Sequence, residues 1–255
     1  MSAIVAFVRR PRLAGRAISL PILIATAVPA LLLAFAAGWM GHGWLAGDRA
    51  PRAFEGFQLV RLKTIQTQLD QIEGPYIVVL GDSHAERLYL PSLCGIPVVN
   101  AGLSGATASD VVDLARKISL PRKAQAVLLS VGTNDIWVKR KPESTEAERG
   151  FRTALADLEE YLAGWSDRRA LIAIPPVASQ EEALFPRTAA NRYSAMLARS
   201  CEAKGCLYLD LFAKAAEPPE PRSAFSDGVH LRDYARFVRD REVEICRGLG
   251  IAVWS

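Results

Sequence analysis

Two polar groups far apart in the sequence contain the residue types that a hydroxyl nucleophile needs. Gly81-Asp82-Ser83-His84 supplies a serine, and Asp227-Gly228-Val229-His230 supplies an imidazole three residues after a carboxylate. A serine attacks a carbonyl when a base takes its proton, and the base needs a carboxylate to hold its tautomer. We predict that Ser83, His230 and Asp227 are the nucleophile, the base and the orienting carboxylate.

Two further groups supply candidate donors for the oxyanion that forms in ester hydrolysis. These groups are Asn100-Ala101-Gly102 and Gly132-Thr133-Asn134-Asp135. The predicted donors are the backbone N–H groups of Ser83 and Gly102 and the side-chain amide of Asn134. A glycine at position 102 would let its N–H approach closely, with no Cβ in the way.

Each group alone has an ordinary structural explanation. Ser83 is a good residue type for a helix N-cap, and Asn134-Asp135 and Asp227-Gly228 are common turn pairs. The chemical interpretation therefore requires that the fold bring the groups together.

The elements between these groups predict such a fold. Apolar runs typical of buried strands alternate with patterns typical of helices. The expected strands are 76–81, 96–102, 125–132, 170–176 and 207–212. The expected helices are 107–119, 145–164, 188–203 and 231–249. Alternation of this kind indicates a parallel sheet covered on both faces. We predict a flavodoxin-like three-layer α/β/α sandwich with a five-stranded parallel sheet. Ligands bind outside the carboxyl ends of such strands, where the polar groups are expected.

On these residues the chain resembles the SGNH (GDSL-type) hydrolase family. Gly81-Asp82-Ser83, Gly102, Gly132-Thr133-Asn134-Asp135 and Asp227-x-x-His230 match its four blocks in order, over about residues 75–250. The resemblance implies a flavodoxin-like fold and a serine esterase that uses neither a metal nor a cofactor. His84 departs from the family, which commonly has an aliphatic residue there. We expect this second imidazole either to touch the substrate or to face solvent.

The first part of the chain has the pattern of a membrane anchor. Arg9, Arg10, Arg12 and Arg16 form a basic leader, residues 1–16, and no charged residue occurs from 17 to 47. We predict a single transmembrane signal-anchor helix at 17–41, because the apolar run is long enough to span a bilayer. The positive-inside rule then places the protein in the inner membrane, with the catalytic domain on the periplasmic or extracellular side. A cleaved secretory signal ending at Ala34-Phe35-Ala36 is the alternative.

The net charge follows from this leader. The formal charge is +4, and subtracting the four leader arginines from the 31 basic residues leaves a balance with the 27 acidic ones. A neutral exported domain argues against a nucleic-acid partner.

Residues 42–74 are predicted to be a linker followed by an amphipathic helix. Five apolar residues recur at spacings of three and four, typical of one helical face: Leu59, Leu62, Ile65, Leu69 and Ile72. We expect this helix to pack on the domain at 75–255; the alternative is a stalk that pairs with a second copy. The oligomeric state is left open.

The four cysteines are Cys94, Cys201, Cys206 and Cys246, without a C-x-x-C pair. With only three histidines in the chain, a metal site is not expected. Export would place the cysteines in an oxidising compartment, where one or two disulfides can form. Cys201–Cys206 is the preferred pair, and buried free thiols are the alternative.

Two stretches that follow strands are expected to shape the substrate pocket. They are 136–150 and 175–192, and neither is strongly apolar. We therefore expect an acylated small-molecule or glycan substrate, for example an acetylated envelope or secreted polysaccharide. The alternatives are an O-acyltransferase of the same fold and a catalytically inactive scaffold that binds a glycan or a partner.

Overall fold

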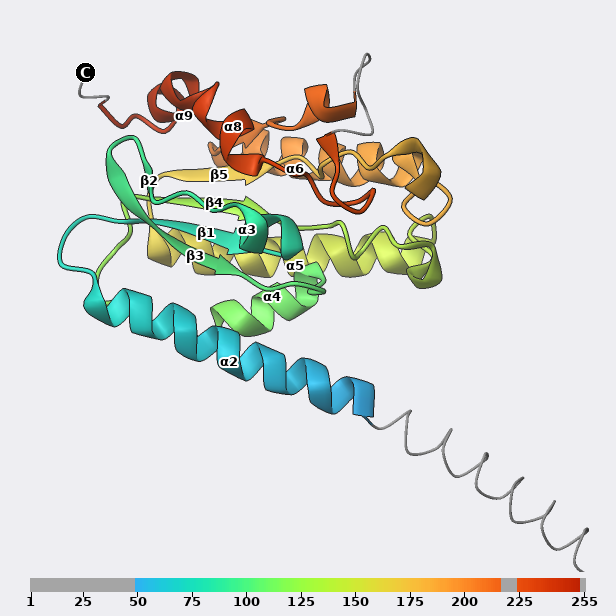
Figure 1. Ribbon diagram of the computed structural model, residues 1–255, viewed down its shortest axis with the longest axis horizontal. Helices are drawn as coiled ribbons and strands as arrows, with labels where there is room; N and C mark the ends of the chain where they lie inside the picture. Colours follow the sequence, from blue (N-terminus) through green and yellow to red (C-terminus); the bar gives the residue numbers. More distant parts are fainter. Residues whose placement is uncertain (1–48, 217–223, 253–255) are drawn as a thin grey trace, which may run out of the picture. The chain divides into compact units, whose positions relative to one another are not determined.

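A computed structural model of the chain describes residues 49–216 and 224–252 (Figure 1). The predicted leader at 1–16 and the predicted transmembrane segment at 17–41 lie outside these residues. Among the helices that the structure describes, none is long and apolar enough to cross a membrane. Residues 56–255 form one compact unit, and the fold below is that of this unit.

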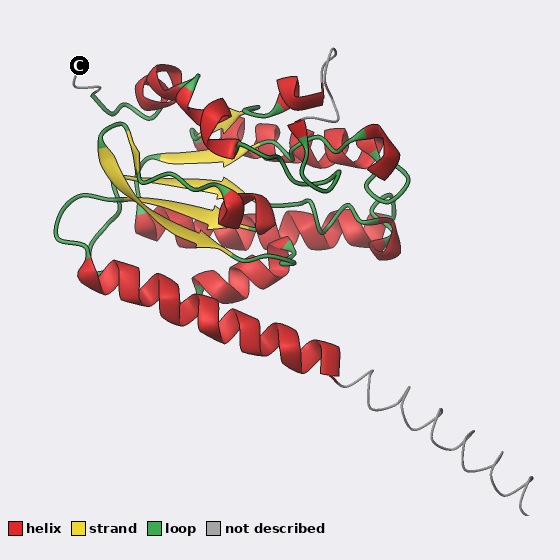
Figure 2. Cartoon of the chain, viewed as in Figure 1, coloured by secondary structure: helices red, strands yellow, loops and turns green. Residues whose placement is uncertain are grey.

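The sheet has six strands in the order β2-β3-β1-β4-β5-β6 (Figure 2). Five of them are parallel and correspond to the predicted strands: β1 (Ile77–Gly81), β3 (Ile96–Gly102), β4 (Ala126–Ser130), β5 (Arg169–Ile172) and β6 (Leu207–Leu209). Their order is that of a flavodoxin-like sheet.

The prediction of a purely parallel, five-stranded sheet was wrong at one edge. There β2 (Ser92–Leu93) pairs with β3 in the antiparallel direction, so the sheet is mixed. Cys94 and Gly95 connect the two strands, both with positive φ. A two-residue loop with this conformation matches the twist of a hairpin. Two residues are too few to produce a periodic pattern in the sequence.

The helices that the structure describes in full cover both faces of the sheet. They are α2 (Arg49–Gln71), α3 (Ser83–Arg87), α4 (Ala108–Ala115), α5 (Thr145–Trp165), α6 (Arg187–Lys204), α8 (Tyr234–Arg239) and α9 (Glu242–Gly248). The single helix predicted at 231–249 is therefore two short helices. The helical backbone is interrupted at Arg241, whose guanidinium donates to the Asp210 carbonyl oxygen at 2.7 Å.

Alternate residues of the central strands build two cores. Ile77 and Val79 of β1 and Leu128 of β4 pack in one cluster with residues of α3, α8 and α9. Because side chains alternate along a strand, Val78 and Leu80 face the opposite layer. Both are buried. The three-layer arrangement agrees with the prediction.

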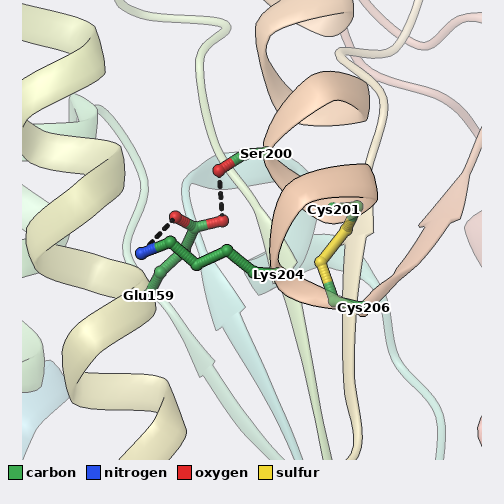
Figure 3. Close-up of a disulfide and its surroundings, with 5 residues drawn as sticks. All are labelled: Glu159, Ser200, Cys201, Lys204 and Cys206. Atoms are coloured by element: carbon green, nitrogen blue, oxygen red, sulfur yellow. Dashed lines mark hydrogen bonds and ion pairs between the residues drawn. A yellow bond between two sulfur atoms is a disulfide. The ribbon is translucent and has the colours of Figure 1, made fainter.

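Two disulfides tie helices to strands at the edges of the fold. Cys94–Cys246 joins the β2–β3 turn to α9, and Cys201–Cys206 joins the end of α6 to the start of β6 (Figure 3). The preferred pair, Cys201–Cys206, is therefore present in the structure. Beside it, the buried Glu159 of α5 accepts a hydrogen bond from Ser200 and pairs with Lys204 at 3.4 Å (Figure 3).

Candidate active site

Ser83 lies on a tight strand-to-helix turn. The cap of α3 is Asp82, whose carboxylate accepts the His84 N–H at 2.9 Å, so Ser83 is the first helical residue and not the cap. The structural explanation of Ser83 as an N-cap is therefore wrong. The first residue of a helix has no intrahelical acceptor for its N–H. Ser83 thus combines a hydroxyl at the sheet edge with a backbone donor that the helix does not use.

The structure brings Ser83, His230 and Asp227 into one chain of hydrogen bonds. Ser83 Oγ lies 2.8 Å from His230 Nε2, and His230 Nδ1 lies 2.8 Å from Asp227 Oδ2. The other oxygen, Asp227 Oδ1, accepts the N–H groups of Val229 at 3.1 Å and His230 at 2.8 Å. These bonds hold the carboxylate against the ring that it orients. Residues 147 positions apart are joined by the fold.

The surroundings of Asp227 favour its ionised form. Partial burial alone would raise its pKa, but hydrogen bonds from the His230 backbone, the His230 ring and the Val229 N–H outweigh burial and lower the pKa of Asp227 well below its ordinary value. Arg87 of α3 adds a positive charge 3.4 Å from Asp227 Oδ2. The carboxylate is therefore charged when the imidazole needs a partner.

Gly102 has surroundings that differ from its predicted role. Its N–H already donates to Asn100 Oδ1 at 3.0 Å, which argues against its use as an oxyanion donor. A Cβ at this position would lie 2.0 Å from the Glu86 backbone nitrogen. The glycine is needed there because β3 passes close to α3.

The segment from Leu103 to Ala108 offers a different donor. Apart from Gly105, each residue of this segment donates its N–H to an acceptor. The pairs are Leu103 to Gly81 O, Ser104 to Glu86 Oε2, Ala106 to Leu103 O, Thr107 to Asp110 Oδ2 and Ala108 to Asp135 Oδ2. Among the described residues, only the Gly105 N–H in this segment has no acceptor. Gly105 is exposed and has a φ of 80°, a conformation that suits glycine. Sequence analysis did not single out Gly105, although a second glycine three residues after Gly102 was a visible signal.

Asn134 lies beside the Gly105 turn and beside the nucleophile turn. Its Nδ2 donates to the Ala106 carbonyl oxygen at 2.9 Å, which leaves the second amide hydrogen for a ligand. The preceding Thr133 N–H donates to Asp82 Oδ2 at 3.3 Å. These contacts hold the Thr133-Asn134 segment against the turn that carries Gly105 and the turn that carries Ser83.

Two buried carboxyl groups support these turns. Burial raises the pKa of Asp82 to about 7, despite the N–H groups of His84 and Thr133 that donate to it. Burial likewise raises the pKa of Asp135 to about 6, and its Oδ2 accepts the Ala108 N–H at 2.9 Å. Asp135 therefore holds the first turn of α4 to the loop that carries Asn134.

His84 is buried beside His230, with ring centroids 5.2 Å apart, so the expectation that it faces solvent was wrong. Its Nδ1 lies 2.7 Å from the Tyr234 hydroxyl, which also accepts the Leu231 N–H at 3.1 Å. Tyr234 is thus the one hydrogen-bond partner of the His84 ring among the described residues, and His84 Nε2 has none. Burial, with the charges of His230 and Arg87, lowers the pKa of His84 to about 3, so the ring is neutral at neutral pH.

The second predicted pocket stretch lines a cavity of about 440 Å³. Its walls combine apolar Pro175, Pro176 and Phe185 with polar Asn191 and Asp210. The first stretch contributes Ile136 alone, and no triad residue lines this cavity. Within residues 49–216 and 224–252, no cluster of three or more His, Cys, Asp or Glu side chains is arranged to hold a metal ion.

Comparison with known families assigns the chain to one of them. The model of the GDSL-like Lipase/Acylhydrolase family matches residues 68–234, about two thirds of the chain. The chain belongs to this family. The family match covers Ser83 and Asp227-Gly228-Val229-His230 as well as the segments that carry Gly105 and Asn134.

Solved structures share the fold of this GDSL-like chain at low sequence identity. A proposed platelet activating factor from Streptococcus pneumonia is 19% identical with a TM-score of 0.59, over 78% of this chain and 99% of its own. A lipase/acylhydrolase from Enterococcus faecalis is 20% identical with a TM-score of 0.56, over 71% and 100%. A catalytic mutant of an acetylxylan esterase from Geobacillus stearothermophilus is 18% identical with a TM-score of 0.55, over 72% and 98%. A comparison with curated protein sequences found no match.

Proposed function

We propose that the chain is a serine esterase that hydrolyses carboxylic esters through Ser83, His230 and Asp227. The observation that carries the proposal is the pair of 2.8 Å contacts that joins the Ser83 hydroxyl, both nitrogens of the His230 ring and the Asp227 carboxylate. Membership of the GDSL-like family supports a hydrolase.

In the proposed mechanism, His230 Nε2 takes the Ser83 proton while Oγ bonds to the ester carbonyl carbon. The carbonyl oxygen becomes an oxyanion, which accepts the N–H groups of Ser83 and Gly105 and the free Asn134 amide hydrogen. The intermediate collapses when the C–O bond to the alcohol breaks and His230 returns the proton to the leaving oxygen. In the second half, the same imidazole takes a proton from water as the water oxygen bonds to the acyl carbon. The bond to Ser83 Oγ then breaks, His230 returns the proton to Oγ, and the acid is released.

For the substrate, we infer an acyl group on a small molecule or a glycan, with deacetylation of an envelope or secreted polysaccharide as the specific case. An acetylxylan esterase among the proteins of similar fold is consistent with this choice. The mixed polar and apolar cavity lined by residues 175–191 is suited to part of a sugar.

For the location, we propose a single-pass anchor in the inner membrane with the hydrolase domain outside the cytoplasm. The uncharged run at 17–47 after four arginines supports this topology. The two disulfides also suit an oxidising compartment.

Replacement of the nucleophile tests the esterase proposal. Ser83→Ala should lower turnover of p-nitrophenyl acetate by about 10⁴-fold or more, because the remaining groups cannot form an acyl-enzyme. Ser109→Ala, which changes an exposed serine of α4, is the matched control and should behave as wild type. If Ser83→Ala kept a tenth of the wild-type rate, another residue would be the nucleophile.

The same assay separates hydrolysis from acyl transfer. With an added polysaccharide acceptor, a hydrolase releases acetate and leaves the acceptor unmodified. A transferase would produce acetylated acceptor at the expense of acetate, and this product would contradict the hydrolase assignment.

A further inference from the structure

Helix α2 begins outside the part of the chain that the family model matches, yet it contacts the candidate active site. The family match starts at residue 68, and Arg61 precedes it. The Arg61 guanidinium donates to the Gly102 carbonyl oxygen through Nε at 3.0 Å and through Nη2 at 2.8 Å. Nη2 also lies 3.3 Å from the Asn100 carbonyl oxygen. A side chain from outside the matched domain therefore binds the carboxyl end of β3.

Buried side chains and hydrogen bonds fix α2 on the domain on the C-terminal side of this arginine. Ile65 and Leu69, one and two turns farther along, are fully buried. Gln66 forms two hydrogen bonds with the backbone of Ser119, donating to its carbonyl oxygen at 3.0 Å and accepting its N–H at 3.1 Å. The predicted packing of this helix on the domain is thus confirmed, and Arg61 is held in place by its own helix.

The contact of Arg61 with Gly102 leads directly to the nucleophile strand. The Gly102 carbonyl and the Leu103 N–H belong to one planar peptide unit. That N–H donates at 2.9 Å to the carbonyl oxygen of Gly81, the last residue of β1 before Asp82 and Ser83. By fixing one side of the peptide, the guanidinium orients the other side toward β1.

A second branch of the same network leads to the Gly105 turn. Arg61 Nε lies 3.7 Å from Glu86 Oε1, and Glu86 Oε2 accepts the Ser104 N–H at 2.6 Å. Glu86 belongs to α3, three residues after Ser83. Ser104 directly precedes Gly105, so the carboxylate that pairs with Arg61 also fixes the peptide next to the free N–H.

We propose that Arg61 is a positioning residue for ester hydrolysis, which holds the Gly102 peptide and the Glu86 carboxylate so that the Gly105 N–H points toward the oxyanion. The proposal rests on the esterase function proposed above. It makes α2 a working part of the active site and not a linker to it. Arg61 touches neither the substrate nor the triad, so its loss should act through the placement of the donor.

The test uses the full chain in detergent and measures kcat and KM for p-nitrophenyl acetate. Arg61→Ala should lower kcat about tenfold to a hundredfold, somewhat less than outright removal of an oxyanion donor, because the Gly105 N–H remains but is misplaced. KM should stay within about twofold, since the donor acts on the transition state. Arg61→Lys keeps the charge but not the two-pronged geometry and should lie between Arg61→Ala and wild type.

Two control variants separate positioning from stability. Lys63→Ala removes an exposed charge from the same helix and should leave kcat and the unfolding temperature unchanged. Gln66→Ala loosens the docking of α2 without touching the Arg61 contacts; it should lower the unfolding temperature and leave kcat close to wild type. The pH dependence of kcat should be the same in Arg61→Ala and wild type, because the base is intact.

The outcomes distinguish this inference from the esterase proposal. An active wild type with normal kcat in Arg61→Ala would overturn the role of Arg61 alone. A loss of activity that Gln66→Ala shares, in proportion to its lower unfolding temperature, would make Arg61 an ordinary structural contact and also overturn the inference. Absence of esterase activity in the wild type would reject the proposed function, and the inference with it.

Discussion

His84 and His230 are neighbouring imidazoles in very different surroundings. Their ring centroids lie 5.2 Å apart. His230 has a charged partner in Asp227, whereas His84 has only the neutral Tyr234 hydroxyl as a hydrogen-bond partner among the described residues. A second positive charge beside His230 would oppose formation of the imidazolium that the proposed mechanism requires. A neutral, buried His84 avoids this repulsion.

The pKa of His84 predicts how acid destabilises the fold. Its folded pKa is about 3, below the ordinary value of 6.5, so the unfolded chain binds more protons between these pH values. The free energy of unfolding that His84 contributes is therefore fully present above pH 6.5 and is lost as the pH falls. Relative to His84→Gln, which does not titrate, wild type should lose about 1.4 kcal/mol per pH unit below 6.5.

Denaturant unfolding of both proteins from pH 7 to pH 4.5 measures this difference. Asp82 has a raised pKa of about 7 and contributes the opposite slope, with stability lost as the pH rises. Because Asp82 is present in both proteins, its contribution largely cancels in the comparison. A pH-independent difference between wild type and His84→Gln would mean that His84 is not buried as a neutral group.

At the scale of elements, two glycines three residues apart serve different purposes. Gly102 lies where β3 meets α3, and a Cβ there would lie 2.0 Å from the Glu86 backbone nitrogen. Gly105 lies in the exposed turn between β3 and α4, where its left-handed conformation presents an N–H. The first is a packing requirement between two elements, and the second is a property of the connection between two others.

Alanine substitutions should separate these purposes. Gly102→Ala forces β3 away from α3 and should lower the free energy of unfolding by about 1–3 kcal/mol or more. Gly105→Ala strains the backbone by about 1–2 kcal/mol and should lower kcat at least about tenfold by turning the donor. Gly164→Ala, in an open position of α5, is the control and should be neutral or stabilising.

Thermal unfolding and kcat, measured on the same samples, distinguish the two positions. Gly105→Ala should lose more activity than its stability explains, and Gly102→Ala should be impaired mainly in stability. The reverse order would restore Gly102 as the donor and leave Gly105 as an ordinary turn residue.

The elements also show what periodicity can and cannot predict. In α5, Phe151, Leu155 and Leu158 recur at helical spacing and are all buried, as expected from the sequence. The window 231–249 has a similar pattern, but it forms two helices that meet at Arg241, whose side chain contacts the distant Asp210 carbonyl. Tertiary contacts also explain why Gly102, and not Gly105, was predicted as a donor. Residue types and order singled out Ser83, Asp227 and His230, which the structure joins by hydrogen bonds. The use of the Gly102 N–H by the Asn100 side chain is a tertiary contact with no signal in the sequence.

At the scale of the whole molecule, sequence reasoning favoured one of the two disulfides and did not identify the other, because pairing over a long separation is a property of the folded chain. Cys94–Cys246 closes a loop between residues 152 positions apart, so it joins the β2–β3 hairpin to the C-terminal helix α9. Cys201–Cys206 closes a loop between residues five positions apart. Only the shorter loop connects neighbours in the sequence, and it was the pair that sequence reasoning favoured.

The two loops predict unequal contributions to stability. Restriction of the unfolded chain contributes about 5 kcal/mol for a loop of roughly 150 residues and about 2 kcal/mol for one of about six residues. The double variant Cys94→Ser/Cys246→Ser should therefore unfold at a clearly lower temperature than Cys201→Ser/Cys206→Ser.

The unfolding temperature of each variant is compared with that of wild type in oxidising buffer. Reductant should lower the wild-type unfolding temperature to below that of either double variant, because it removes both bridges. If the two variants were equally stable, or if reductant had no effect on wild type, the disulfides would not carry the stability assigned to them, and the proposed export to an oxidising compartment would lose one of its two supports.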